Sequence, residues 1–260
     1  MKNTNFVIIN RKVIMLSFHF YLKSTILFML LTTCQPDKRW DCIQSTGKIV
    51  QENRILTPFD KIEVHDKIEI EIFLRNTYSV EIQAGKNLLN DIQTEVKDNT
   101  LIIRNLNRCN FMRDPSKKIH IKIFMPYLLS LQHYGYANIF LRDTLETDSV
   151  AVFNEGNGDI HMHIRTKILY GASYASGDMY FEGTATHFYY HMNGSNFLYS
   201  QNLAVKDYIY ISHFSIGDAY VYPLGWLEGE LRNTGNLYYK GNPVILGFKN
   251  TKGARLIQMN

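Results

Sequence analysis

The chain has 260 residues, of which 45% are hydrophobic and 20% are charged, proportions that exclude an intrinsically disordered protein. The formal net charge is only +4, and the basic residues are not clustered beyond adjacent pairs such as Lys38-Arg39 and Lys117-Lys118, so nucleic acid is not expected as a partner. The 17 Tyr and 15 Phe, against only 6 Pro, favour a structure rich in β-strands.

Residues 1–33 have the pattern of a secretory signal peptide. Four basic side chains between Lys2 and Lys23 precede or flank an apolar run that ends at Leu31. The uninterrupted run is too short for a transmembrane helix, which needs about 20 apolar residues. Met15 is an alternative start that gives a signal peptide of ordinary length.

The apolar run ends in Leu31-Thr32-Thr33-Cys34, which resembles a bacterial lipobox. We therefore predict that Cys34 is lipidated, and a lipid chain would anchor the protein to the outer membrane without spanning it. Residues 34–57 would form a lipid-anchored tether, and the protein would lie in the cell envelope, on the periplasmic or the cell-surface side. The alternative is a chance cysteine after an apolar run.

A lipidated Cys34 leaves Cys42 and Cys109 as an even pair in an oxidising compartment. We predict a disulfide between them, which would tie the tether to a polar loop. Two free thiols are the alternative.

Residues 58–127 alternate apolar and polar side chains, as half-buried strands do. Asp98-Asn99 lies between two such segments and predicts a tight hairpin turn. We expect this region to form the first coils of the structure or a β-sheet that caps it, because an uncovered solenoid end exposes apolar area and a strand edge.

Residues 128–257 repeat a short pattern every 18–22 residues, in which a small residue precedes Asn or Asp and alternating apolar residues follow. The repeated Asn or Asp residues are Asn138, Asp159, Asp178, Asn196, Asp218 and Asn236. Units this small cannot bury a core alone, so the repeat predicts an all-β, solenoid-like stack similar to a parallel β-helix. The small residues suggest tight corners with positive φ angles.

Strand alternation assigns the repeat positions to two faces. The positions one and three after each Asn or Asp are expected in the core: Ile139, Ile160, Met179, Phe197, Ala219 and Leu237, then Leu141, Met162, Phe181, Tyr199, Val221 and Tyr239. The position between them is expected to face outward: Phe140, His161, Tyr180, Leu198, Tyr220 and Tyr238.

The repeat, together with Phe59-Asp60-Lys61-Ile62-Glu63-Val64 near its start and Tyr239-Lys240-Gly241-Asn242-Pro243 near its end, resembles the GIN-domain family of auto-transporter adhesin head domains in secreted bacterial proteins. The resemblance spans most of residues 55–257. It implies a right-handed all-β solenoid and a cell-envelope location, and it brings no catalytic residues.

The sequence contains no nucleophile elbow, phosphate loop or dinucleotide fingerprint. Asp159 and Asp178 share a corner column and could serve a polysaccharide-cleaving enzyme. The same column also holds Asn, which favours a structural role in the turn. His161 and His163 share one strand face, and His133, His191 and His213 share a column, but neither set has the further ligands that zinc needs. We predict no catalytic residue, no metal and no cofactor.

The outward aromatic residues are the strongest candidate for a functional surface. Phe140, Tyr180, Tyr220, Tyr222 and Tyr238 would form a stripe that could contact sugar rings or another protein. Alternatively, a further strand could cover these rings, or the rings could stack on one another for stability. The leading hypothesis is a non-enzymatic envelope lipoprotein that binds extracellular carbohydrate or protein. A polysaccharide-active enzyme and a scaffold without a soluble ligand are the alternatives.

Overall fold

The computed structural model describes residues 45–107 and 118–259. The signal peptide expected at residues 1–33, the lipidation residue Cys34, and both cysteines of the expected disulfide, Cys42 and Cys109, lie outside these ranges. Within the described ranges, no helix is both long and apolar enough to cross a membrane.

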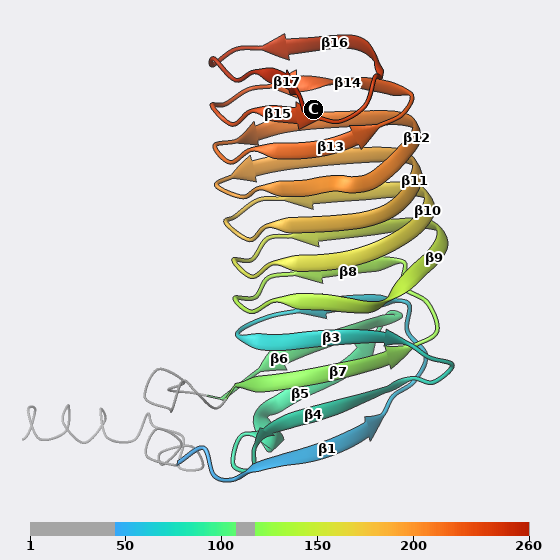
Figure 1. Ribbon diagram of the computed structural model, residues 1–260. Helices are drawn as coiled ribbons and strands as arrows, with labels where there is room; N and C mark the ends of the chain where they lie inside the picture. Colours follow the sequence, from blue (N-terminus) through green and yellow to red (C-terminus); the bar gives the residue numbers. More distant parts are fainter. Residues whose placement is uncertain (1–44, 108–117, 260) are drawn as a thin grey trace, which may run out of the picture. The chain divides into compact units, whose positions relative to one another are not determined.

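The described chain is an all-β solenoid of about seven turns, which confirms the predicted fold class (Figure 1). The elements are β1 (Ile49–Ile55), β2 (Lys61–Val64), β3 (Ile68–Leu74), β4 (Ser79–Gly85), the short 3-10 helix η2 (Leu89–Asp91), β5 (Ile92–Lys97), β6 (Thr100–Asn105), β7 (Ile119–Met125), β8 (Ser130–His133), β9 (Ile139–Asn154), β10 (Ile160–Ser173), β11 (Met179–Gly194), β12 (Leu198–Ser215), β13 (Ala219–Pro223), β14 (Trp226–Leu231), β15 (Leu237–Tyr239), β16 (Val244–Asn250) and β17 (Leu256–Gln258).

Parallel pairing stacks each coil on the one before it. Ile139 of β9 pairs with Ile160 of β10, which pairs with Met179 of β11, so equivalent residues form rows along the stack. The long strands bend, and their two halves form two faces of the solenoid (Figure 1). Alternate side chains of both halves are buried between these faces and form a continuous apolar core.

The N-terminal part supplies both the first coil and a cap. β2 pairs in parallel with β8, and β3 pairs in parallel with β9, so these two strands continue the stack. Beyond them, antiparallel pairs join β1 to β4, β4 to β7, and β5 to β6. Asp98 and Asn99 turn the β5–β6 hairpin with φ angles of 50° and 59°, which confirms the predicted turn.

β1 lies within the segment 34–57 that the sequence assigns to a tether. From Ile49 to Ile55 the chain pairs along its length with β4, so this part is a strand of the domain. Its inward side chains include Glu52 and Arg54 and are only half-buried. An edge strand of this kind lacks the apolar alternation by which the other strands are recognised.

The fourth repeat differs by one residue from the sequence prediction. Leu198, expected to face outward, pairs with Met179 and Ala219 and is fully buried. Phe197 and Tyr199, both expected in the core, lie on the outer face. A one-residue slip moves every side chain of a strand to the opposite face, so placing Asn196 in the Asp column misassigned the whole segment.

Two corner glycines, Gly158 and Gly177, are needed for close stacking and not for a positive φ. A Cβ atom on Gly158 would lie 2.1 Å from the carbonyl oxygen of Ala137, and one on Gly177 would lie 2.2 Å from that of Gly158. Neither glycine has a positive φ. The expectation of left-handed corners is therefore wrong at these positions, although the preference for small residues is correct.

Candidate functional site

Six rings form a continuous stack along the outer face of the first halves of the coils. We call this stack the aromatic ladder, and it consists of Phe140, His161, Tyr180, Tyr199, Tyr220 and Tyr238. Successive ring centroids lie 4.8, 4.2, 4.7, 5.5 and 4.9 Å apart, with interplanar angles between 5° and 15°. The parallel register of the strands sets this spacing, because equivalent residues lie directly above one another.

The ladder presents ring edges to solvent. Each inner ring is covered on both faces by its neighbours in the ladder, and all six side chains are half-buried. A sugar that stacks on an aromatic face therefore has no free face within the ladder. Ring edges are the electropositive part of the π-system, and four tyrosines add a phenolic hydroxyl that can donate or accept a hydrogen bond.

The ladder contains four of the five residues expected in the stripe, together with two rings that were not included there. Phe140, Tyr180 and Tyr220 are joined through His161 and Tyr199, while Tyr238 extends the stack from Tyr220. Tyr199 was missed because of the slip at Asn196. The recurrence of tyrosine at positions 180 and 199, with the same spacing of 19 residues as Asp159 and Asp178, is the signal that could have located it.

Tyr222 lies off the ladder. Its backbone pairs with Ala204 after a register shift, two residues beyond the Tyr199–Tyr220 pair. The ammonium of Lys240 lies 4.8 Å from the centre of the Tyr222 ring, a cation–π contact. Tyr222 and the ladder therefore do not form one stack.

Charged groups border the ladder at its N-terminal end. The guanidinium of Arg142 lies 4.6 Å from the centre of the Phe140 ring and also pairs with Glu71 at 2.5 Å. His120 contacts the other carboxylate oxygen of Glu71 at 3.1 Å. These groups place planar hydrogen-bonding side chains next to the first ring.

Burial and nearby carboxylates raise the pKa of three ladder tyrosines, Tyr180, Tyr199 and Tyr220. Burial, followed by the charges of Asp178 and Asp159, raises the pKa of Tyr180 to about 12. Burial is also the largest cause of the raised pKa of Tyr199 and of Tyr220. These three phenols therefore remain hydrogen-bond donors at neutral pH.

The Asp and Asn side chains of the corners hold adjacent coils together. Asn138 accepts the backbone N–H of Asp159 at 3.0 Å, Asp159 accepts that of Asp178 at 2.9 Å, and Asp178 accepts that of Phe197 at 2.8 Å. The same bond recurs from Asn236 to Asp218 at 2.7 Å. Since only a side-chain oxygen is needed, Asn and Asp are equivalent here, which confirms the structural interpretation of this column.

The histidines do not assemble a metal site in the part of the chain that the structure describes. His133 is buried and its Nδ1 contacts Oδ1 of Asn154 at 3.1 Å, while His191 contacts the hydroxyl of Ser212 at 3.2 Å on the outer side. His213 shares the inner column with His133, but His191 does not, again because the fourth repeat is displaced. Burial lowers the pKa of His133 to about 4, so this side chain is neutral near pH 7.

A second group of rings lies on the other face and was not predicted. Tyr170 stacks on Tyr189 at 5.4 Å, and Tyr189 contacts Tyr208 at 5.8 Å. Tyr208 pairs along the backbone with the exposed Trp226. The recurrence of tyrosine at positions 170, 189 and 208, 19 residues apart, is the sequence signal for this group.

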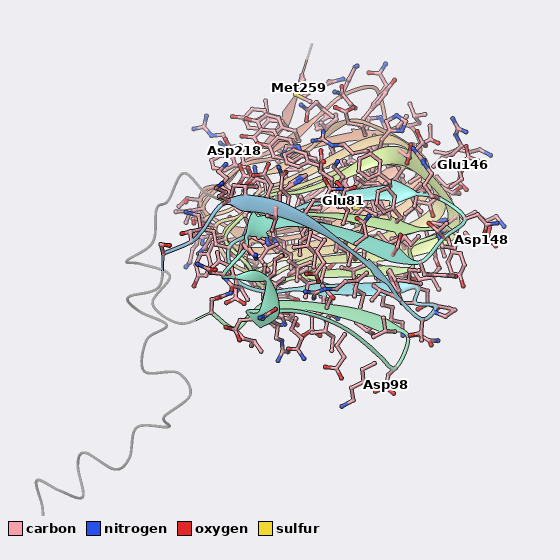
Figure 2. The ribbon with its side chains drawn as sticks, turned by 90° about the horizontal axis from the view of Figure 1, so that it is seen from below. Glu81, Asp98, Glu146, Asp148, Asp218 and Met259 are labelled. Carbon is pink, nitrogen blue, oxygen red and sulfur yellow. The ribbon has the colours of Figure 1, made fainter. Side chains whose placement is uncertain are left out.

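The two lateral edges of the coils differ in chemistry. Figure 2 shows Asp218 at one edge and Glu146 and Asp148 at the opposite edge, where the long strands bend. The bend contains an open hollow of about 720 Å³ lined by charged and threonine side chains, including Arg165, Lys167 and Thr184. Arg165 pairs with Glu146, and Lys167 pairs with Asp148, so these ion pairs compensate much of the charge around the hollow.

The fold is similar to that of several solved structures. An adhesin from Bacteroides fragilis, described as putative, has a TM-score of 0.78 and 23% sequence identity, covering 83% of this chain and 99% of its own. One from Parabacteroides distasonis has a TM-score of 0.64 and 18% identity, covering 82% and 98%. A "putative lipid binding protein" from the same species has a TM-score of 0.63 and 17% identity, covering 83% and 98%.

At these identities the structures show a common fold. No curated protein matches the chain. The family model described as "Putative auto-transporter adhesin, head GIN domain" matches residues 58–243, which is more than half of the sequence. The matched residues contain the first coil, most of the repeats and the aromatic ladder, and the chain therefore belongs to the GIN-domain adhesin family.

Proposed function

We propose that this protein is a lipid-anchored adhesin of the cell envelope whose aromatic ladder binds an extracellular protein. The observation that supports this function best is the continuous row of six partly exposed rings, from Phe140 to Tyr238, on one face of the solenoid. Tyrosine combines a rigid apolar body with a polar tip, and it is enriched in protein interfaces for this reason.

The geometry of the rings favours a protein over a carbohydrate as the ligand. Sugars use the faces of aromatic rings, whereas these rings cover one another's faces at 4.2 to 5.5 Å. A polypeptide can instead place carbonyl oxygens on the phenolic hydroxyls and apolar side chains against the ring edges. The Arg142–Glu71 pair at the end of the ladder adds a polar border to this surface.

Parallel arrays of extracellular-matrix proteins and of glycans test this proposal. The full-length chain in detergent is compared with a Tyr199→Ala/Tyr220→Ala variant and with a Tyr170→Ala/Tyr189→Ala control, which removes two stacked rings from the other face. We expect protein binding that the ladder variant loses and the control retains. Equal loss in both variants, or retention in the ladder variant, contradicts the proposal.

The glycan array separates the remaining functions. Glycan binding that depends on Tyr199 and Tyr220 would indicate that the ligand of the ladder is a carbohydrate and not a protein. Release of saccharide that Asp159→Asn/Asp178→Asn abolishes would indicate a polysaccharide-active enzyme. Binding to neither array, together with specific cross-links to envelope proteins, would indicate a scaffold.

The lipid anchor and the disulfide are parts of the same proposal. Incorporation of labelled palmitate that Cys34→Ala abolishes, together with protease shaving of intact cells, tests anchoring and surface exposure. Mass spectrometry of the non-reduced protein tests the Cys42–Cys109 bond, and two free thiols would contradict it. A palmitate-negative wild-type protein would contradict the anchor.

A further inference from the structure

The last coil leaves its outer strand edges without a partner among the described residues. β16 pairs with β14, and β17 pairs with β15, each on the side of the preceding coil. Figure 1 shows β16 as the outermost strand at this end of the stack. Backbone N–H and C=O groups on such an edge are a template for a further strand.

The core of the solenoid is also open at this end. Ile209, Leu227 and Ile245 occupy one core row, and their exposed fractions are 0%, 0% and 41%. On either side of Ile245, Val244 is 57% exposed and Leu246 is 53% exposed. Val244 continues the outer row of Trp226, whereas Ile245 continues the core row and lies at the free edge where another coil would cover it.

The opposite end of the stack, at the first coil, is capped. There, β1 and β4 to β7 cover the first coil, and their core side chains, such as Ile82 and Ile121, are fully buried. Solenoids require such caps because each coil buries its apolar surface only against its neighbours. In contrast, residues 45–107 and 118–259 leave the last coil without such a cap.

The charge of the last coil restricts what can complete it. Residues 237–259 contain four basic side chains and no acidic one. These four, Lys240, Lys249, Lys252 and Arg255, are all exposed. Two copies of this chain meeting end to end would bring eight like charges together, which disfavours a second copy as the occupant.

The free edge is also protected against indiscriminate pairing. The register shifts between Leu227 and Glu228 of β14, so that Leu246 forms a bulge in β16 opposite them. Bulges and edge lysines are the features by which proteins prevent unspecific strand addition. A strand that nevertheless binds here must offer acidic side chains to the lysines and apolar side chains to the open core.

From these observations we propose that the last coil accepts an extended, acidic segment of a partner protein, which pairs along β16 and completes the stack. Its apolar side chains would cover Ile245, and its carboxylates would contact Lys249 and Lys252. Main-chain hydrogen bonds would supply affinity, and the alternating side chains would supply specificity. This surface is separate from the aromatic ladder.

A charge-swap experiment tests the proposal. The probe is a labelled peptide of about seven residues, the length of β16, in which glutamate and valine alternate. A second peptide replaces glutamate by lysine, and a third has the first composition in scrambled order. Binding to the full-length chain in detergent is measured by fluorescence anisotropy, and circular dichroism verifies that each variant is folded.

We expect the acidic alternating peptide to bind and the other two to bind at least about tenfold more weakly. Lys249→Glu/Lys252→Glu should reverse the preference toward the lysine peptide. Ile245→Asp should weaken the binding of both the acidic and the lysine peptide. Arg165→Glu/Lys167→Glu at the distant bend is the matched control and should leave the preference unchanged.

Three results would overturn the proposal. They are equal binding of the acidic and scrambled peptides, an unchanged preference in Lys249→Glu/Lys252→Glu, and absence of peptide binding. Sedimentation showing dimers that Ile245→Asp dissociates would assign this end to a second copy instead. If the aromatic ladder proves not to bind a protein, this test still stands, because the ladder and the last coil are tested with different variants.

Discussion

The two lateral edges of the coils obey different constraints. At the corner of Gly158 and Asp159, backbones approach so closely that a Cβ atom does not fit, and side-chain oxygens bind the N–H groups of the next coil. At the opposite bend, the register shifts between β10 and β9, between β11 and β12, and between β12 and β13. The corner therefore sets the regular spacing of the stack, and the bend absorbs differences in coil length.

The largest expected effect is at the corner. Gly177→Val places side-chain atoms against the carbonyl oxygen of Gly158 and should lower the free energy of unfolding by about 4 kcal/mol or prevent folding. Thr184→Val at the bend, where the side chain is exposed, should change it by less than about 0.5 kcal/mol. Urea denaturation measures both, and similar effects would refute the difference between the edges.

The buried His133 inside the corner should make the stack sensitive to acid. The pKa of His133 is about 4 in the folded protein and near 6.5 in the unfolded chain, so the unfolded chain binds a proton first as the pH falls. The contribution of neutral His133 to the free energy of unfolding is fully present above pH 6.5. It is lost as the pH falls from 6.5 to about 4, and it amounts to roughly 3 kcal/mol.

His133→Asn should flatten this pH dependence, because the same column holds Asn154 and Ser173 in the next coils. The exposed His163→Asn is the control and should retain it. Denaturant titrations at several pH values give the slope of the free energy of unfolding against pH. An identical slope in wild type and His133→Asn would assign the acid sensitivity to other groups.

The corner carboxylates should act as hydrogen-bond acceptors. Asp178→Ala leaves the N–H of Phe197 without its acceptor at 2.8 Å and should cost about 1 kcal/mol. Asp178→Asn keeps an acceptor oxygen, and it removes a carboxylate whose pKa is raised mainly by burial, so its cost should be smaller. Thermal unfolding distinguishes the two, and equal losses would indicate that the charge matters instead.

The smallest effect is expected from the ion pairs of the bend. Lys167 and Asp148 lie 2.8 Å apart, but their side chains remain 72% and 84% exposed. Lys167→Ala should therefore change the free energy of unfolding by less than about 0.5 kcal/mol. A loss above about 1 kcal/mol in urea denaturation would show that the bend contributes to stability as the corner does.

The prediction from sequence succeeded where the determinants are local. Alternation of apolar residues such as Ile160 and Met162 identifies strands, and the repeated small residues before Asp159 and Asp178 identify the corners. The Asp98-Asn99 turn was likewise predictable, since these residue types adopt positive φ at low cost.

The prediction failed where the register depends on stacking. Asn196 is of the residue type found in the Asp column, yet it takes the place that Gly158 and Gly177 have in their coils. A Cβ atom on Gly217 would lie 2.2 Å from the carbonyl oxygen of Asn196, and a Cβ atom on Gly177 would lie at the same distance from the carbonyl oxygen of Gly158. Its amide donates hydrogen bonds inward, to the carbonyl oxygens of Asn193 and Ala175. Residue type alone does not distinguish the two columns, so Tyr199 was assigned to the wrong face.

The sequence by itself determined that this chain is a stack of β coils with an alternating core, because strand period and corner residues are properties of neighbouring positions. Only the tertiary structure decided which rings cover one another, that β1 joins the domain, and that the core row ending at Ile245 is open at one end of the stack. These features depend on contacts between residues about 20 or more positions apart, and such contacts are set by the register of whole coils.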